Sequence, residues 1–156
     1  MIKHIWTVLC RQSILNKDDN TISLLNVLED LKVTIKPSGQ NIPDMSKGLI
    51  NLPFNFELVS LWEFDNPPRP KAQVEITYED PSGKKLANFI QGLEIPQDKN
   101  LKRIRSRVNI QGISAGENGR YIFIVSIKEG GSKLFMKVAE IPLQITIEKE
   151  FPKKSS

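Results

Sequence analysis

Cysteine and histidine are almost absent from this chain, which has one of each among 156 residues. A single cysteine, Cys10, cannot form an intrachain disulfide, so the composition favours a reducing compartment and predicts a cytoplasmic protein. One Cys and one His also exclude a zinc site built from such ligands within one chain. His4 and Cys10 should share one face of a first strand, separated by about 20 Å of extended backbone, which excludes a Cys–His dyad. We expect Cys10 to be buried as a small hydrophobe and His4 to lie at an edge or on the surface.

Long apolar runs are also lacking. No segment approaches the roughly 20 apolar residues that a membrane helix needs, and the N-terminal stretch has neither the apolar length nor the cleavage site of a signal peptide. Hydrophobic residues make up 39% and charged residues 26%, which indicates a folded globular chain. The length predicts one domain, over residues 1–148, followed by a basic tail at 149–156.

Recognisable catalytic motifs are missing as well. There is no glycine-rich phosphate loop and no Gly-x-Ser-x-Gly elbow, and no cofactor or metal is predicted. Asp18, Asp19 and Asn20 offer oxygen atoms in one turn, but a calcium site would need carboxylates from several loops. A plain polar turn is therefore the preferred interpretation. An enzyme with an unrecognised carboxylate site is kept as an alternative.

Alternation of apolar and polar residues is what the chain has in abundance. It predicts half-buried strands, because side chains of an extended backbone alternate between two faces. The clearest segments are 54–65, 71–79, 121–127 and 141–147. In the first segment, Trp62 and Phe64 are expected in the core rather than in an exposed patch.

Turn signals separate these segments. Asp80-Pro81-Ser82-Gly83 should join 71–79 to a strand at about 84–95, and Gly130-Gly131 predicts a two-residue hairpin between 120–128 and 132–139.

Three other stretches have less regular patterns. Residues 20–36 fit a helix or two strands, and we favour strands at 21–28 and 31–36. Residues 37–53 are predicted to be a long irregular loop. Pro67-Pro68-Arg69-Pro70 could dock in an aromatic groove as polyproline II, although a rigid inter-strand loop is preferred.

Eight or nine short strands with frequent turns predict an all-β fold, an antiparallel β-sandwich of the immunoglobulin/C2-like kind, with a barrel as the alternative. Tyr121, just after Gly119, is a candidate tyrosine corner, in which the hydroxyl bonds back to the upstream backbone.

The order of motifs resembles a family of short bacterial hypothetical proteins, a domain of unknown function. The matching segments are Cys10, Leu25-Asn26-Val27-Leu28, Asp80-Pro81-Ser82-Gly83, Gly119-Arg120-Tyr121-Ile122-Phe123 and Pro142-Leu143-Gln144-Ile145. In place of the Gly that often follows the second motif, this chain has Glu29. The resemblance implies a β-sandwich and no particular activity.

A basic stripe is the sharpest functional signal. On a strand, Arg103, Arg105 and Arg107 would share one face beside Lys102, at a spacing of about 6.6 Å. Three guanidinium groups could meet phosphates or an acidic partner. The alternative is a solvated face paired with Glu75 or Glu79 on a neighbouring strand, or one that keeps a sheet edge from aggregating.

These observations predict a non-enzymatic binding module whose partner is another protein. The alternatives are an anionic ligand, either nucleic acid or a membrane surface, bound through Lys102, Arg103, Arg105 and Arg107. The formal net charge of +4 permits this. Self-association through an edge strand or a sheet face is a further expectation.

Overall fold

Nine β-strands form the regular structure of the computed structural model, which describes residues 1–36 and 48–150. No helix occurs within those ranges, so none there could cross a membrane. The strands are β1 Ile2–Leu15, β2 Ile22–Val27, β3 Asp30–Ile35, β4 Ile50–Phe64, β5 Ala72–Glu79, β6 Lys85–Leu93, β7 Arg103–Ala115, β8 Gly119–Glu129 and β9 Met136–Lys149.

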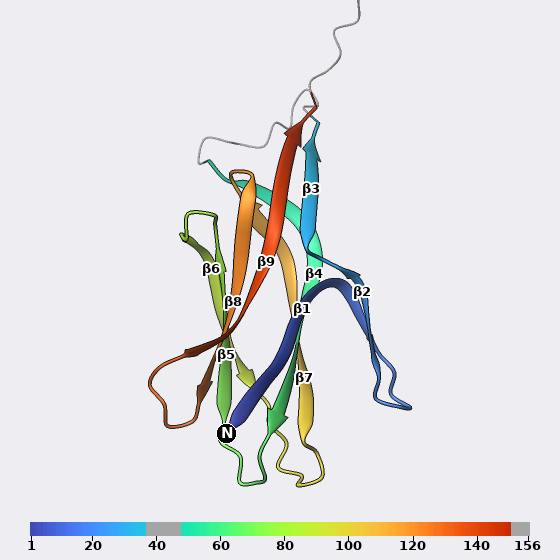
Figure 1. The fold of residues 1–156 in the computed structure, drawn as a ribbon, viewed down its shortest axis with the longest axis vertical. Coiled ribbons are helices and arrows are strands. Elements are labelled where there is room, and N and C mark those ends of the chain that lie inside the picture. Colours follow the sequence, from blue (N-terminus) through green and yellow to red (C-terminus); the bar gives the residue numbers. More distant parts are fainter. Residues whose placement is uncertain (37–47, 151–156) are drawn as a thin grey trace, which may run out of the picture.

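The strands form two sheets (Figure 1). Sheet A has the order β2-β1-β4-β7, and sheet B has the order β3-β9-β8-β5-β6. All neighbours are antiparallel except β3 and β9, which run parallel. The expectation of purely antiparallel pairing is therefore wrong at this pair. The link of Leu28 and Glu29 carries the chain from sheet A to sheet B without reversing it, so β3 enters its new sheet in the direction of β9.

One hydrophobic core joins the two sheets. Trp62 of sheet A is fully buried, and Phe64 is 4% exposed, which confirms that this end of β4 belongs to the core. Phe56 of sheet A meets Phe123 of sheet B edge to face, with ring centroids 5.8 Å apart. Tyr78 stacks on the same Phe123 at 4.7 Å. Aromatic packing of this kind adds to the burial of apolar area that holds the two layers together.

Most predicted strands occur close to their expected positions. The ambiguous region 20–36 forms the two strands β2 and β3. The loop expected over 37–53 ends earlier than predicted, because β4 already begins at Ile50. The prediction of a loop rested partly on Pro53, which has no N–H to donate in a ladder. Pro53 lies where the β4–β7 register shifts between Leu52 and Asn55, and such an irregularity accommodates proline within a strand. Residues 37–47 lie outside the described residues, as do 151–156 of the predicted tail.

The C-terminal strands differ from expectation in two respects. The predicted strand at 132–139 begins only at Met136, and from there it forms one continuous strand, β9, with the predicted strand at 141–147. Pro142 does not interrupt it, because β3 pairs with β9 only from Gln144 onward, and no other described strand pairs with β9 on that side of Pro142. The connection after β8 spans Gly130 to Phe135 rather than two residues.

The turn at 80–83 forms as predicted. The backbone N–H of Gly83 donates to the carbonyl of Asp80 at 2.9 Å, and Gly83 has a φ of +84°. The Asp80 carboxylate accepts from the backbone N–H groups of Ser82 and Lys84 at 2.9 and 2.8 Å. These bonds lower the pKa of Asp80, with the Ser82 hydroxyl as the largest cause.

Candidate binding cleft and the arginine strand

The predicted basic stripe lies on β7, an edge strand of sheet A. As the alternation predicts, Ser106 and Val108 face inward: the Ser106 hydroxyl accepts from Trp62 Nε1 at 2.8 Å, and Val108 is 8% exposed. Arg103 and Arg107 are exposed. The stripe is thus a row of cationic side chains along a strand that forms an edge of sheet A in the described residues.

Two of the arginines have carboxylate partners on β4. Arg103 forms an ion pair with Glu63 at 2.7 Å, and Arg107 lies 3.8 Å from Glu57. The expected partners, Glu75 and Glu79, are wrong, because they lie on β5 in the other sheet, whereas β7 pairs with β4. The pair of Arg103 and Glu63 is exposed, and such pairs contribute roughly 0–1 kcal/mol. The Glu57 side chain, in contrast, is largely buried. Both pairs offset part of the positive charge of the stripe.

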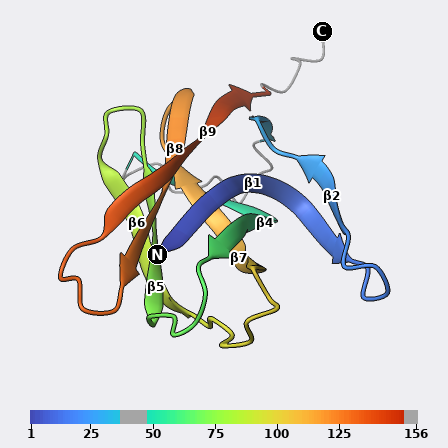
Figure 2. The ribbon, with the colours of Figure 1, turned by 60° about the horizontal axis from the view of Figure 1, so that its bottom comes forward.

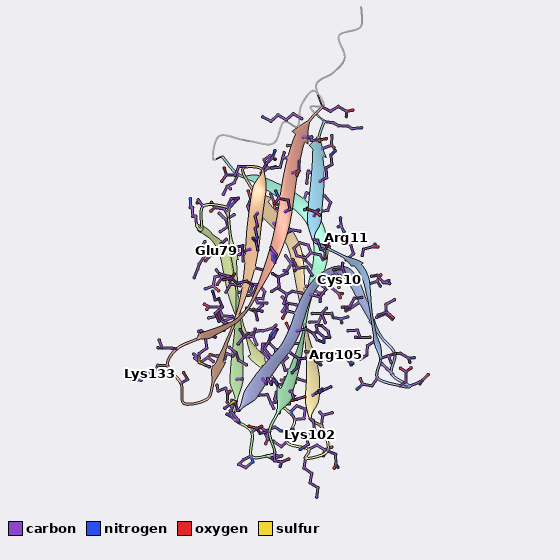
Figure 3. All side chains as sticks on the ribbon, viewed as in Figure 1. Cys10, Arg11, Glu79, Lys102, Arg105 and Lys133 are labelled. Atoms are coloured by element: carbon purple, nitrogen blue, oxygen red, sulfur yellow. The ribbon has the colours of Figure 1, made fainter. Side chains whose placement is uncertain are left out.

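The remaining cations contact uncharged groups. Arg105 Nη1 donates to Asn20 Oδ1 at 3.0 Å, and its Nε is buried without a hydrogen-bond partner among the described residues. Lys102 donates to the Asn66 side chain. Asn20 lies in the turn of the β1–β2 hairpin, so this hairpin curves back beside the stripe (Figures 1 and 3).

His4 and Cys10 do not share a face. An extra residue between His4 and Trp6 shifts the β1–β4 register, so that His4 lies opposite Trp62 but Cys10 lies opposite Glu57. This bulge reverses the alternation that the sequence suggested. His4 is half-buried rather than on the surface, since it hydrogen-bonds Thr7 at 2.7 Å and packs edge to face on Trp62.

Burial shifts the pKa of both residues. It lowers the pKa of His4 and raises the pKa of Cys10, whose side chain is fully buried as predicted. A thiol with a raised pKa is a poor nucleophile at neutral pH.

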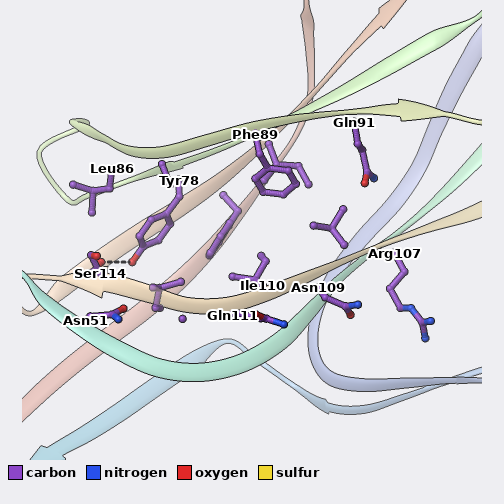
Figure 4. A pocket seen from close by; sticks show the side chains of 16 residues that line it. Asn51, Tyr78, Leu86, Phe89, Gln91, Arg107, Asn109, Ile110, Gln111 and Ser114 are labelled. Atoms are coloured by element: carbon purple, nitrogen blue, oxygen red, sulfur yellow. Dashed lines mark hydrogen bonds between the residues drawn. The ribbon is translucent and has the colours of Figure 1, made fainter.

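A cleft of about 490 Å³ opens between β7 of sheet A and β5 and β6 of sheet B. Both β6 and β7 are edge strands, and the cleft therefore lies along the open side of the two-sheet core. Figure 4 shows Phe89 and Ile110 between the two edges, with Gln91 directed from β6 towards β7. The lining residues are Asn51, Ile76, Tyr78, Leu86, Ala87, Phe89, Gln91, Arg107, Val108, Asn109, Ile110, Gln111, Gly112, Ile113, Ser114 and Phe123.

The lining is apolar inside and amide-rich at the rim. Ile76 and Phe123 are buried core residues, while Phe89 and Ile110 are half-buried. Side-chain amides come from both sheets, and Arg107 is the one charged side chain among the described lining residues. Such a surface suits a ligand that has apolar groups and either neutral or negative polar groups.

Gly112 has a backbone conformation that the rim of the cleft requires. It has a φ of +86°, and a Cβ there would lie 3.3 Å from both Asn51 Oδ1 and the carbonyl of Leu52. Both residues directly precede the register shift of β4. A larger residue would strain the backbone at the point where β7 borders the cleft.

Arg69 fixes the chain that leads into β7. It is 7% exposed, and its guanidinium donates to four backbone carbonyls. These are the carbonyls of Asp65 at 2.8 Å, Pro96 at 2.5 Å, Asp98 at 3.1 Å and Leu101 at 2.7 Å. Residues 67–70 thus form the predicted inter-strand loop, held by the hydrogen bonds of Arg69, and the burial of Arg69 withdraws the central arginine of the Pro-rich segment from a partner.

Two tyrosines fix the other end of β7. Tyr78 donates to the carbonyl of Ser114 at 3.0 Å, and burial raises its pKa, so the hydroxyl keeps its proton. The Tyr121 hydroxyl accepts from the backbone N–H of Gly116 at 3.0 Å and donates to the carbonyl of Glu117 at 3.0 Å. Tyr121 therefore makes the upstream backbone bonds predicted for a tyrosine corner.

The carboxylates of the described residues offer no comparable site. Asp19 accepts from the Thr21 hydroxyl and backbone N–H at 2.7 and 3.0 Å, as a polar turn would. Across residues 1–36 and 48–150, no group of three potential ligands converges on a metal position. A second hollow, near β1 and β9, is lined by Glu29 and Asp30, and both are exposed to solvent. The described residues therefore add no support for the alternative of an enzyme with a carboxylate site.

The fold defines a class: an all-β domain of two sheets around one core. No family model matches the chain, and no curated protein matches it. Among solved structures, the chain is similar to the C-terminal domain of wzt, with a TM-score of 0.54 and 11% identity. The similarity covers 99% of this chain and 81% of that one. At this identity the likeness shows the fold alone.

Sequence reasoning missed most of the cleft. The arginine alternation continues into Asn109 and Gln111, which could have extended the stripe towards the cleft. Phe89 and Gln91 gave no such signal, because their place opposite β7 depends on the order of strands in both sheets. The structural role of Arg69 was also missed, since its acceptors are carbonyls that no residue pattern reveals.

Proposed function

We propose that this protein is a non-enzymatic binding module that holds an extended segment of another protein in the cleft between β6 and β7. One observation carries the proposal: a free edge strand from each sheet borders the same apolar-floored cleft. Edge strands have unpaired backbone N–H and C=O groups. An added peptide strand can satisfy those groups while alternate side chains enter the cleft.

The chemistry of the lining specifies the segment. Phe89 and Ile110 favour apolar side chains at alternate positions of the peptide. Arg107 favours neutral or acidic residues between them, because none of the described lining residues is a carboxylate. The 13 residues of β7 provide an edge longer than a typical strand of about five or six residues.

The test starts from a phage-displayed random-peptide library selected on the whole protein. We expect enriched peptides with alternating apolar residues and net negative charge, measured afterwards as synthetic peptides by fluorescence anisotropy. Phe89→Ala should weaken binding roughly tenfold or more, as for loss of a buried aromatic anchor. Ile90→Ala is the matched control, since Ile90 is adjacent on β6 but 50% exposed and not among the cleft residues.

A charge reversal separates this site from the whole stripe. Arg107→Glu should weaken an acidic peptide, while Arg103→Glu, on the same face but outside the cleft lining, should have little effect. Failure to select any peptide, or equal binding by the Phe89→Ala and unmodified proteins, would overturn the proposal.

Binding of an anionic polymer or membrane surface through Lys102, Arg103, Arg105 and Arg107 is the second candidate. The exposure of Lys102, Arg103 and Arg107 favours it, and the ion pairs of Arg103 and Arg107 oppose it. This candidate predicts retention on heparin that falls with salt. Retention that survives replacement of all three arginines by alanine would exclude it.

The fold likeness and the shared core support a β-sandwich of the immunoglobulin/C2-like kind, which we include in the proposal. Cytoplasmic location and kinship with the short bacterial proteins of unknown function stay predictions from the sequence.

A further inference from the structure

The connection between β8 and β9 projects beyond both sheets. Figures 1 and 2 show it as the brown loop, and Figure 3 places Lys133 at its outer end. Two large apolar side chains lie on it with little cover: Leu134 is 75% exposed, and Met136, the first residue of β9, is 63% exposed. These two side chains are too exposed to contribute to the core, and exposed apolar groups of this kind often mark a site of interaction.

Local contacts hold this tip in shape. The backbone N–H of Gly130 donates to the carbonyl of Lys71 at 2.6 Å, which ties the base of the loop to the start of β5. The Ser132 hydroxyl accepts from the N–H of Leu134 at 3.2 Å and donates to the Leu134 carbonyl at 3.0 Å. Gly131 has a φ of +91°, which a glycine adopts without strain. The loop thus presents Leu134 in a defined backbone conformation.

The same segment is basic. Residues 128–137 contain Lys128, Lys133 and Lys137 against one carboxylate, Glu129. Glu129 accepts a hydrogen bond from the N–H of Ile2 at 2.9 Å. Lys128 Nζ lies 4.8 Å from the ring centre of Phe135. Lys137 pairs with one further carboxylate, Glu140, at 2.5 Å, but both side chains are well exposed, so negative phosphates could compete for the lysine.

We propose that this tip binds the surface of an anionic lipid bilayer. Leu134 and Met136 enter the boundary between headgroups and acyl chains, and Lys133 and Lys137 contact the lipid phosphates. Apolar side chains flanked by lysines are the combination that interfacial membrane binding uses. A protruding tip can insert into a fluid bilayer without a preformed site, whereas a protein partner would need a pocket of matching shape.

This site is separate from the cleft and from the arginine stripe. Phe89 and Arg107 line the cleft, and no residue of the segment 128–137 does. A membrane bound through the tip would therefore leave the edges of β6 and β7 free for the proposed peptide. The two proposals can fail independently.

The test is co-sedimentation of the whole protein with two kinds of vesicle: phosphatidylcholine alone, and an equimolar mixture of phosphatidylcholine and phosphatidylglycerol. We expect binding to the mixed vesicles and little to the neutral ones, with a steep decrease on adding salt. The double variant Leu134→Ala/Met136→Ala should lower the partition coefficient roughly tenfold or more, as burial of two apolar side chains implies.

Matched controls separate the tip from other surfaces. Ile90→Ala/Ile14→Ala removes apolar side chains of 50% and 49% exposure elsewhere and should bind as the unmodified protein does. Lys133→Glu should weaken binding to the mixed vesicles only. Because Leu134 and Met136 are exposed, the tip variant should keep its circular dichroism spectrum and melting temperature.

Three results would overturn the proposal. They are no binding to mixed vesicles, equal binding by the tip variant and the unmodified protein, or loss of binding only when Arg103, Arg105 and Arg107 are replaced. The last outcome would assign membrane binding to the arginine stripe instead.

Discussion

The two edges of sheet A, β2 and β7, differ in charge and in anchoring. Over Ile22–Val27, β2 has no charged residue and exposes Leu25 and Val27 to 41% and 52%. β7 has Arg103, Arg105 and Arg107 on its outer face. The unpaired backbone groups of an exposed edge strand can pair with another chain, unless charged side chains or other features prevent it. The charged edge is therefore protected from indiscriminate pairing, whereas the uncharged edge is not.

Anchoring separates the two edges further. Arg69 fixes the chain before β7, and Tyr78 and Tyr121 fix its end. β2 is held by its pairing with β1 and by a short polar turn. A binding site needs a defined geometry before its ligand arrives, because ordering a loose strand opposes binding. This favours β7 as the edge for specific recognition and β2 as the edge for self-association.

Removing the anchor before β7 should have the largest effect. Arg69→Ala leaves four carbonyls without their donor and should lower the free energy of unfolding by about 3–5 kcal/mol. Urea unfolding measures this loss, and hydrogen exchange along β7 should approach that of β2. Arg103→Ala, at an exposed position, is the control and should cost less than about 1 kcal/mol. If the free energy of unfolding of Arg69→Ala lies within about 1 kcal/mol of that of the unmodified protein, Arg69 does not anchor the chain before β7.

Loosening the other end of β7 should have a smaller effect. Tyr121→Phe deletes the hydroxyl that bonds Gly116 and Glu117 and should cost about 1–3 kcal/mol, read from the thermal midpoint. Tyr78→Phe deletes a single bond to Ser114 and should cost about 0.5–1.5 kcal/mol. Equal losses in the two variants would show that the link between β7 and β8 needs no tyrosine corner.

Charging the uncharged edge should hardly change stability. Leu25→Lys/Val27→Lys alters exposed positions, so the free energy of unfolding should change by about 0.5 kcal/mol or less. Light scattering over a concentration series should show the unmodified protein gaining mass and the variant staying monomeric. An unmodified protein that is monomeric throughout would contradict self-association through β2. The converse variant, with alanine at Arg103, Arg105 and Arg107, should associate more strongly.

The sequence predicts features that depend on neighbouring residues better than features that depend on distant segments. The strands at 71–79 and 121–127 were predictable, because alternation and turn residues act between near neighbours. The alternating face of Arg103–Arg107 was predictable for the same reason. The order of strands, the parallel pair β3–β9 and the cleft were not, since each depends on which distant segments pair. The bulge after His4 could not be foreseen either, because it arises from the fit between β1 and β4.

The parallel pairing of β3 with β9 has a consequence for how the chain folds. Asp30–Ile35 pairs with Gln144–Lys149, which leaves the ribosome more than a hundred residues later. Until then β3 lacks its partner strand, and closing so long a loop is slow compared with forming a hairpin. We therefore expect the late synthesis of β9 relative to β3 to limit the folding rate. Loss of residues 144–149 should leave β3 unpaired and the newly made chain open to aggregation.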